Sequence, residues 1–315
     1  GTDRGTAKGQ RMIHGILNVY KERGYTSHDV VAKLRGILGQ KKIGHTGTLD
    51  PDAEGVLPVC LGRATKLCDM LTDKDKCYEA VLLLGVRTDT QDISGQVVGT
   101  GDASQLYAET VRQAIRSFQG GYEQTPPMYS ALKVNGKKLY ELAREGKTVE
   151  RKARRVEIYK IEILEASLPR VRMQVWCSKG TYIRTLCHDI GEKLGCGGCM
   201  ESLIRTRAGS FTIEDSLTLL EIERLKREDR LESAVLPIDE MFREHPAAVL
   251  QETWEKLAYN GNPLPFKAIR GAAGFRDLER IRLYDSREDF IGIYEFREPE
   301  KEFVTVKMFY TGKRD

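Results

Sequence analysis

The sequence predicts an α+β fold with a largely antiparallel sheet, because helical and strand-like segments are mixed along the chain without the strict alternation of a parallel α/β protein. The clearest helix signal spans residues 26–39, and the clearest strand signal, at 171–177, alternates apolar and polar residues. The 315 residues are about twice the usual size of one domain. We therefore expect about two domains.

The first strong helix signal is an apolar pattern at helical spacing, formed by Val30, Val31, Leu34, Ile37 and Leu38. Thr26 followed by Asp29 indicates a capping box, and Gly39 suits the end of a helix. The segment 43–61 contains three glycines and two prolines with little periodicity. This composition predicts a long ordered loop leading into a strand.

The remaining elements follow from the same patterns. Strands are predicted at 78–84, 155–164 and 171–177, and helices near 105–118, 138–144, 181–194 and 217–230. Near residue 243 the pattern of predicted elements changes. A short helix is expected from 245 to 260, and it is followed by strands near 281–284, 290–294 and 303–310. We therefore predict one domain over 12–243 and a small β-rich domain over 244–315. Residues 1–11 are polar and unpatterned, and are expected to be an expression remnant or tail.

Composition excludes several classes of protein. With 40% hydrophobic and 30% charged residues, the chain is too apolar for a disordered polymer and too polar for a membrane protein. It has no run of about 18 uncharged apolar residues, which a membrane span requires. The seven cysteines are odd in number and form no even framework, which favours free thiols in a reducing compartment. We expect a cytoplasmic protein that does not bind membranes.

The net charge of +4 hides an uneven distribution. Residues 133–155 contain nine basic and three acidic side chains, a net +6, whereas residues 212–240 carry a net −5. Tyr129 and Tyr140 lie in or beside the basic segment. Two interpretations stay open on composition alone: a solvated charged helix face, or a basic arm for a phosphate backbone.

The segment 44–58, GHTGTLDPDAEGVLP, is the strongest candidate for chemistry. A carboxylate directly before a proline is pushed toward extended geometry, so Asp50 would be displayed by a rigid loop. The alternative is an ordinary Asp-Pro turn at a loop tip.

Two further residues could join this site. Arg184 follows a predicted strand and lies in the first turn of the next helix, where a cation opposes the helix dipole. We therefore expect a carboxylate beside it, unless it is an exposed arginine without a role. Tyr78 opens a predicted strand and could stack on a base, although most strand tyrosines merely pack.

Other chemistries lack support in the sequence. Cys187-His188 with Cys196 and Cys199 is a weak zinc signal without a second pair at finger-like spacing, and we expect no metal site. The chain contains no phosphate-loop, dinucleotide-binding, nucleophile-elbow or HExxH motif. Nucleotide hydrolysis, dinucleotide redox and zincin chemistry therefore lose their main supports.

Taken together, the ordered segments of residues 12–210 resemble the tRNA pseudouridine synthase B (TruB) family. The resemblance is carried by KERGYTS (21–27), GHTGTLDPDAEGVLPVCLGRATK (44–66), Tyr78 with GVRTDTQD (85–92), QTPPMYSALKVNGKKLYELAREG (124–146) and SKGTYIRTL (178–186). It implies a pseudouridine synthase catalytic fold with a mixed, mostly antiparallel sheet. It also implies an isomerase, an intramolecular transferase that converts uridine-55 in the tRNA T loop to pseudouridine. The family uses no cofactor, metal or guide RNA, and a monomer that binds the T arm is expected.

The resemblance also assigns roles to residues. Asp50 matches the catalytic aspartate, Tyr78 the tyrosine beside the flipped base, and Arg184 the arginine that pairs with the aspartate and favours its charged form. His45 would help to hold the rearranged T loop, and Lys21 and Leu203 are candidate substrate contacts. Whether Asp50 attacks the sugar or the ring, or acts first as a base, stays open.

The resemblance finally assigns the basic segment and the C-terminal module to RNA. Residues 124–155 match an RNA-binding insertion, in which Lys133, Lys137 and Lys138 would clamp the T arm. The C-terminal module takes the position of a PUA-type RNA-binding domain. Two alternatives remain: a guide-RNA-dependent synthase, against which the insertion argues, and an RNA-binding protein that mainly helps tRNA to fold.

Overall fold

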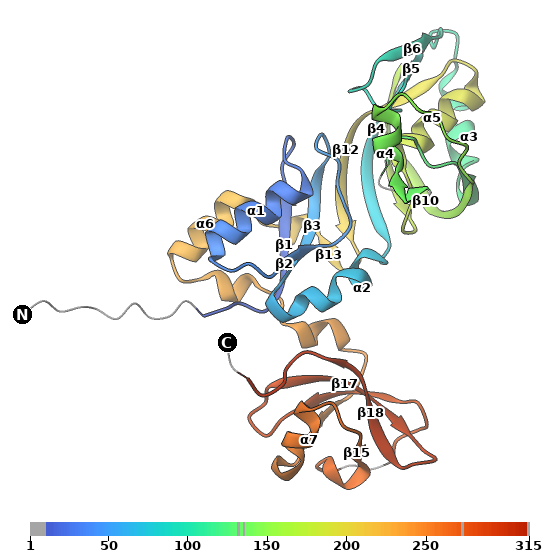
Figure 1. The fold of residues 1–315 in the computed structure, drawn as a ribbon. Helices are drawn as coiled ribbons and strands as arrows, with labels where there is room; N and C mark the ends of the chain where they lie inside the picture. Colours follow the sequence, from blue (N-terminus) through green and yellow to red (C-terminus); the bar gives the residue numbers. More distant parts are fainter. Residues whose placement is uncertain (1–10, 131–132, 135, 272–273, 314–315) are drawn as a thin grey trace, which may run out of the picture.

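A computed structural model describes residues 11–130, 133–134, 136–271 and 274–313. Most of the chain before residue 244 is organised around one nine-stranded sheet (Figure 1). Seven strands follow the order β1-β3-β12-β4-β11-β10-β7, while β2 pairs with β3 and β13 with β12. The strands are β1 (Gly15–Lys21), β2 (Ile43–His45), β3 (Glu54–Leu61), β4 (Lys76–Leu84), β7 (Gly120–Gln124), β10 (Arg154–Ser167), β11 (Arg170–Cys177), β12 (Gly198–Ala208) and β13 (Phe211–Thr212).

Strand pairing in this sheet is antiparallel, except that β12 runs parallel to β3 within the described residues. The parallel contact is short, pairing Ile204 with Glu54 and Arg205 with Gly55. On its other side β12 forms a long antiparallel ladder with β4. The predicted α+β class with a mostly antiparallel sheet is therefore confirmed.

Helices cover the two ends of the sheet in separate groups (Figure 1). Helix α1 (Ser27–Leu38) and helix α6 (Leu219–Arg227) share a core with β1 and β3. Helix α3 (Ala108–Arg116) and helix α5 (Ile183–Leu194) share another core with β4, β10, β11 and β12. The shorter helices are α2 (Cys68–Thr72), α4 (Leu139–Arg144) and α7 (Glu255–Tyr259), and the 3-10 helices are η1 (Gly62–Leu67), η2 (Ile213–Asp215), η3 (Leu231–Ala234), η4 (Ile238–Phe242), η5 (Glu252–Trp254) and η6 (Phe266–Ala268).

Two small hairpins extend from the large sheet. Strands β5 (Val86–Thr88) and β6 (Val97–Thr100) form one, and β8 (Lys133–Val134) and β9 (Lys137–Lys138) form the other. The second hairpin and α4 lie between β7 and β10, so they occupy the predicted insertion.

The C-terminal module has a five-stranded sheet and its own core. The strands are β14 (Ala247–Val249), β15 (Leu264–Pro265), β16 (Arg280–Tyr284), β17 (Phe290–Arg297) and β18 (Glu302–Met308), in the order β14-β16-β17-β18-β15. Phe242 packs in one cluster with Ile293 and Phe309, which joins the module to the segment before it. The domain boundary that we predict near residue 243 falls between η4 and β14.

Helix α1 shows how local sequence determines an element. Thr26 accepts a hydrogen bond from the Asp29 amide, Asp29 accepts one from the Thr26 amide, and Gly39 ends the helix in the left-handed conformation at φ 64°. The predicted capping box is thus confirmed. The predicted strands at 78–84, 155–164 and 171–177 and the four other predicted helices before residue 243 are also present, with bounds shifted by a few residues.

The loop expected within 43–61 leads into a strand as predicted, but it is confined to 46–53, because β2 precedes it and β3 follows it. Strands β1 and β12 were not predicted at all. The helix expected over 245–260 is reduced to α7 and is preceded by β14. The tail expected at 1–11 falls mainly on residues 1–10, which lie outside the described residues.

Two further sequence-based predictions concern the cysteines and membrane-spanning segments. All seven cysteines are free thiols, as the odd number indicated. No helix in the described part of the chain is long and apolar enough to cross a membrane.

At Gly55 the backbones of β3 and β12 lie so close together that they leave no room for a side chain. A Cβ atom there would lie 2.1 Å from the Arg205 carbonyl oxygen, and Gly55 has φ 116°. We predict that Gly55→Ala lowers the free energy of unfolding by at least about 2 kcal/mol in urea denaturation. Gly36→Ala is the control, because the exposed α1 site has nothing within 4 Å, and alanine there should stabilise by up to about 1 kcal/mol. Equal stability of the two variants would contradict this account of the strand contact.

Candidate active site

Asp50 lies in the loop 46–53, which connects β2 to β3. Thr46 anchors the start of the loop by donating through its amide and hydroxyl to the Pro58 carbonyl, at 3.1 and 2.9 Å. Leu49 is buried, and its amide donates to the Ser27 hydroxyl at 3.1 Å. The Ala53 amide donates to the Asp50 carbonyl at 3.0 Å. The Asp50 side chain is nevertheless 46% exposed, so a fixed backbone presents an accessible carboxylate.

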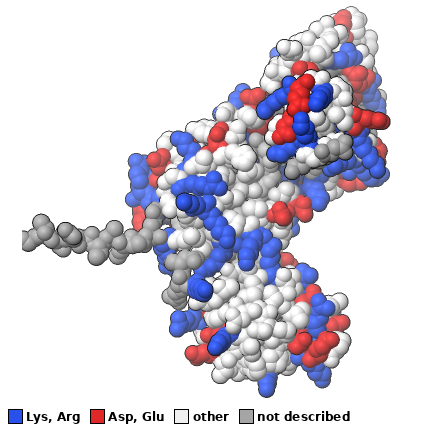
Figure 2. Space-filling view, in the orientation of Figure 1, with Lys and Arg blue, Asp and Glu red and all other residues white. Residues whose placement is uncertain are grey.

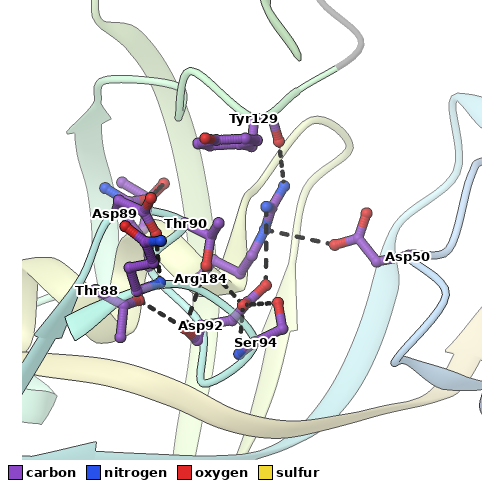
Figure 3. A network of polar contacts seen from close by, with 11 residues as sticks. Asp50, Thr88, Asp89, Thr90, Asp92, Ser94, Tyr129 and Arg184 are labelled. Atoms are coloured by element: carbon purple, nitrogen blue, oxygen red, sulfur yellow. Dashed lines mark hydrogen bonds and ion pairs between the residues drawn. The ribbon is translucent and has the colours of Figure 1, made fainter. Parts of the chain in front are cut away.

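Arg184 lies across from Asp50, in the first turn of α5 (Figure 3). Its Nε atom is 3.4 Å from Asp50 Oδ2, and its Nη1 atom is 3.9 Å from Asp92 Oδ2. Its Nη2 atom donates to the Tyr129 carbonyl at 2.8 Å. The carboxylate expected beside this helix-start cation is present, and a second one accompanies it. Because the Arg184 side chain is only 10% exposed, its contact with the largely buried Asp92 is shielded from water, whereas its contact with Asp50 remains open to solvent on the carboxylate side.

Asp92 is a site residue that the sequence reasoning missed. It lies in the turn between β5 and β6, where Oδ1 accepts hydrogen bonds from the Thr90 hydroxyl at 2.7 Å and the Ser94 amide at 3.0 Å (Figure 3). The Thr88 hydroxyl donates to the Asp92 carbonyl at 2.6 Å. Asp92 stands in the matched segment GVRTDTQD, but its approach to Arg184 depends on tertiary structure.

Tyr78 lies on β4 and is half-buried. Burial raises the pKa of its phenol, and the nearby Asp50 charge adds to this, while the charge of Arg205 and a hydrogen bond from it act in the opposite direction. The phenol therefore remains protonated near neutral pH and lies within the electrostatic reach of Asp50. Arg205, on β12, is a second residue that the sequence reasoning missed.

The resemblance implied that Lys21 contacts substrate, but the structure places its side chain in the interior of the protein. Its side chain is fully buried, and its ammonium donates to the carbonyls of Glu22, Tyr25 and Pro51 at 3.0, 2.6 and 3.3 Å. Burial lowers the pKa of Lys21, and the Asp50 charge opposes this effect. The three donors of the ammonium are thus directed at backbone. Lys21 supports the Asp50 loop from within the protein.

His45 and Leu203 lie near the same loop. His45 ends β2, and its ring meets that of His28 edge-on at a centroid distance of 5.5 Å. Burial, together with the charges of His28 and Arg205, lowers the pKa of His45. Leu203 is only 8% exposed and packs in the core cluster that includes Leu49.

The expected RNA-contacting lysines belong to the insertion. Lys137 forms an ion pair of 2.7 Å with Glu145, and the Lys138 ammonium lies 5.4 Å from the centre of the Tyr140 ring. The side chain of Lys133 is outside the described part. Both charge signs occur around the insertion in Figure 2, whereas Lys and Arg gather on the same face where the large part of the molecule meets the C-terminal module.

The described residues contain no group of three or more His, Cys, Asp or Glu side chains arranged to hold a metal ion. The side chains of this site supply an accessible carboxylate, a guanidinium that orients it, and a protonated phenol. A carboxylate placed in this way can act as a nucleophile or as a base.

Comparison with known proteins identifies the family. A model described as the N-terminal domain of TruB family pseudouridylate synthases matches residues 35–183, and one described as the tRNA pseudouridylate synthase B C-terminal domain matches residues 184–243. The chain belongs to the TruB family. Among its relatives is the tRNA pseudouridine synthase B of Lachnoclostridium phytofermentans, which is 53% identical over 94% of this chain and 100% of that protein. The enzyme of the same name from Clostridium kluyveri is 45% identical, again over 94% of this chain and 100% of that protein.

Solved structures support the fold of this TruB family member. It resembles a chain of a Cbf5-Nop10-Gar1 complex with a TM-score of 0.68 and 28% identity, over 94% of this chain and 85% of that one. It also resembles a chain of the archaeal box H/ACA sRNP Nop10-Cbf5 complex, with a TM-score of 0.66 and 25% identity over 97% and 92% of the two chains. The expected pseudouridine synthase fold is therefore confirmed.

The lowered pKa of His45 predicts a pH dependence of stability. Between this folded-state pKa and the unfolded value near 6.5, the unfolded chain binds more protons, so stability falls as the pH drops through that window. We expect urea denaturation to show a smaller loss of stability between pH 7.5 and 5.5 for His45→Gln than for the unsubstituted protein. Comparing each protein with itself at the two pH values separates titration from lost packing. Identical losses would exclude His45 as the source.

Proposed function

We propose that this TruB family member isomerises uridine-55 in the T loop of tRNA to pseudouridine, without guide RNA. The observation that carries the proposal is the accessible Asp50 carboxylate on an anchored loop, 3.4 Å from Arg184. The names of the relatives, which are matched over their full length, support tRNA as the substrate. The insertion between β7 and β10 supports direct binding of tRNA by the enzyme itself.

In the proposed reaction no atom is gained or lost. The bond from N1 of uracil to C1′ of the ribose breaks, the base rotates, C5 bonds to C1′, and the proton on C5 passes to N1 through solvent or a side chain. Asp50 is the group that meets the ribose or the base, either as a nucleophile or as a base. Arg184 fixes the direction of the carboxylate, because its guanidinium is itself held by Asp92 and the Tyr129 carbonyl.

Tyr78 and His45 suit an extruded uridine. A protonated phenol beside Asp50 offers an aromatic face and a hydroxyl to the base, and can take part in proton transfer at C5. His45 is held toward its neutral form, so it can lie against the T loop without bringing a further positive charge close to Arg205. Extruding the base costs a few kcal/mol, which contacts of this kind would offset.

The decisive test is the substitution Asp50→Asn, which keeps the shape of the side chain and removes its charge. We expect product formation on unmodified tRNA transcript to stop, while the Kd for tRNA changes by less than about threefold, because RNA affinity comes mainly from phosphate contacts. Pseudouridine is mapped at single-nucleotide resolution, without added cofactor or guide RNA.

Asp52→Asn is the matched control, because it removes an exposed carboxylate from the same loop and should leave turnover unchanged. Turnover by Asp50→Asn would refute the catalytic assignment. Tight binding by the unsubstituted protein, without product at any uridine, would instead favour a protein that mainly helps tRNA to fold.

A second test concerns the insertion, which we propose clamps the T arm. We expect Lys133→Gln, Lys137→Gln and Lys138→Gln together to weaken tRNA binding and to reduce the slope of log K against log salt by up to about 3. The control replaces Arg224, Arg227 and Arg230, which are exposed near α6, by Gln. An unaltered slope in the lysine variant would mean that these lysines form an ordinary solvated surface and do not bind tRNA.

The C-terminal module completes the proposal. Its five-stranded sheet and its size are consistent with a PUA-like domain, and we propose that it extends the tRNA-binding surface. The basic face where the two parts meet supports this role (Figure 2). We propose that one copy of the chain acts alone, since Asp50, Tyr78 and Arg184 all come from the same chain.

A further inference from the structure

Arg205 is the largest side chain in the described residues that is almost completely buried, with an exposure of 1%. Its Nε atom donates to the Val56 carbonyl at 2.8 Å, and its Nη2 atom donates to the Gly47 carbonyl at 3.1 Å. Burying a guanidinium is costly unless its charge is compensated by hydrogen bonds. In Arg205, backbone oxygens provide that compensation.

These two carbonyls belong to the two sides of the Asp50 loop. Gly47 lies three residues before Asp50, and Val56 lies in β3, which the loop enters. The strand register adds a third connection, because Arg205 is paired with Gly55 of β3 and with Tyr78 of β4. The positive charge of Arg205 also acts on the phenol of Tyr78, where it opposes the rise in pKa that burial causes. One guanidinium thus holds the loop and the strand after it, from a position in β12 directly opposite the candidate base-contacting tyrosine.

Lys21 supports the same loop at another point. Its ammonium donates to the Pro51 carbonyl, directly after Asp50, while Arg205 holds the Gly47 carbonyl before it. The two buried cations therefore bracket Asp50 along the chain. Arg205 differs from Lys21 in also lying opposite Tyr78 in the sheet.

We propose that Arg205 is a positioning residue that holds the Asp50 loop and the Tyr78 phenol in one fixed relation for the reaction. This inference rests on the proposed function of Asp50. Arg205 contacts neither substrate nor reacting atoms; it acts through the loop and the phenol.

A lysine cannot reproduce this arrangement. The guanidinium is planar and presents several N–H donors in fixed directions, whereas an ammonium is a compact charge on a flexible stem. Arg205→Lys keeps the charge but cannot donate to both Val56 and Gly47 in the same geometry. Arg205→Met removes the charge and leaves two buried carbonyls without their donor, which also weakens folding.

The experiment combines single-turnover kinetics on unmodified tRNA transcript with amide hydrogen exchange of the free protein. For Arg205→Lys we expect the single-turnover rate constant to fall about 100-fold, the loss expected from a misplacement of about 1 Å. The Kd for tRNA should change by less than about threefold, because Arg205 lies inside the protein and away from phosphates. Exchange should become faster in peptides that cover residues 44–53, and remain unchanged in peptides of the C-terminal sheet.

Arg207→Met is the matched control, since Arg207 is exposed on the same strand and its Nε atom donates only locally, to the Gly209 carbonyl at 2.8 Å. It should keep the rate constant and the exchange pattern of the unsubstituted protein. Should Arg205→Met fail to fold, Arg205→Lys carries the test alone.

Three results would overturn the proposal: an unchanged rate constant in Arg205→Lys, a slower rate with unchanged exchange at 44–53, or faster exchange throughout the molecule. The last would mean that Arg205 serves general stability alone. Asp50→Asn is measured in parallel. Turnover by that variant would refute the proposed function, whereas the exchange pattern of Arg205→Lys tests the positioning of the loop separately.

Discussion

The arrangement of the site depends on the short parallel contact between β12 and β3. Strand β12 is paired on its other side with β4, so this contact joins the two halves of the large sheet. The Asp50 loop leads into β3, Tyr78 lies on β4, and Arg184 lies on α5, the helix that precedes β12. The relative positions of Asp50, Tyr78 and Arg184 therefore depend on the pairing of β12 with β3 on one side and β4 on the other. A glycine at position 55 is required because the backbones there are too close for a side chain.

Elements with strong local signals could be predicted from sequence. Helix α1 has a cap at each end and one apolar face, and apolar and polar residues alternate along β11. The local sequence is therefore enough to predict each of these elements. Strand β1 is nearly continuous in apolar residues, which does not distinguish a buried strand from a buried helix. Strand β12 contains two register shifts that break its alternation. The pattern of both strands makes sense only when their neighbours in the sheet are known.

The same distinction applies to the site. Asp50, Tyr78 and Arg184 stand in contiguous motifs, so the amino-acid sequence alone is enough to select them. Asp92 stands in such a motif too, but no local feature indicates that it pairs with Arg184, and Arg205 acquires its partners only through contacts with a distant segment. An arginine in a strand is ordinarily expected on the solvent face. The inward position of Arg205 follows from the register of β12 against β4, which no local pattern specifies.

The cations of this region are compensated in two ways. Lys21 and Arg205 are surrounded by backbone carbonyls, which are neutral and keep their places when protons are gained or lost. Arg184 instead contacts two carboxylates, one of which, Asp50, is exposed to solvent. The contacts of Lys21 and Arg205 therefore form a constant framework, whereas the ion pair of Arg184 depends on the charge of Asp50.

The hydrogen bond from Arg184 to the Tyr129 carbonyl connects the insertion to the candidate active site. Residue 129 lies at the start of the chain segment that forms β8, β9 and α4. A shortened chain that replaced this segment with a tight turn would leave a buried N–H donor of Arg184 without its acceptor. The insertion is thus not an interchangeable appendage: a homologue that lost it would have to supply another acceptor to keep the same arginine in place.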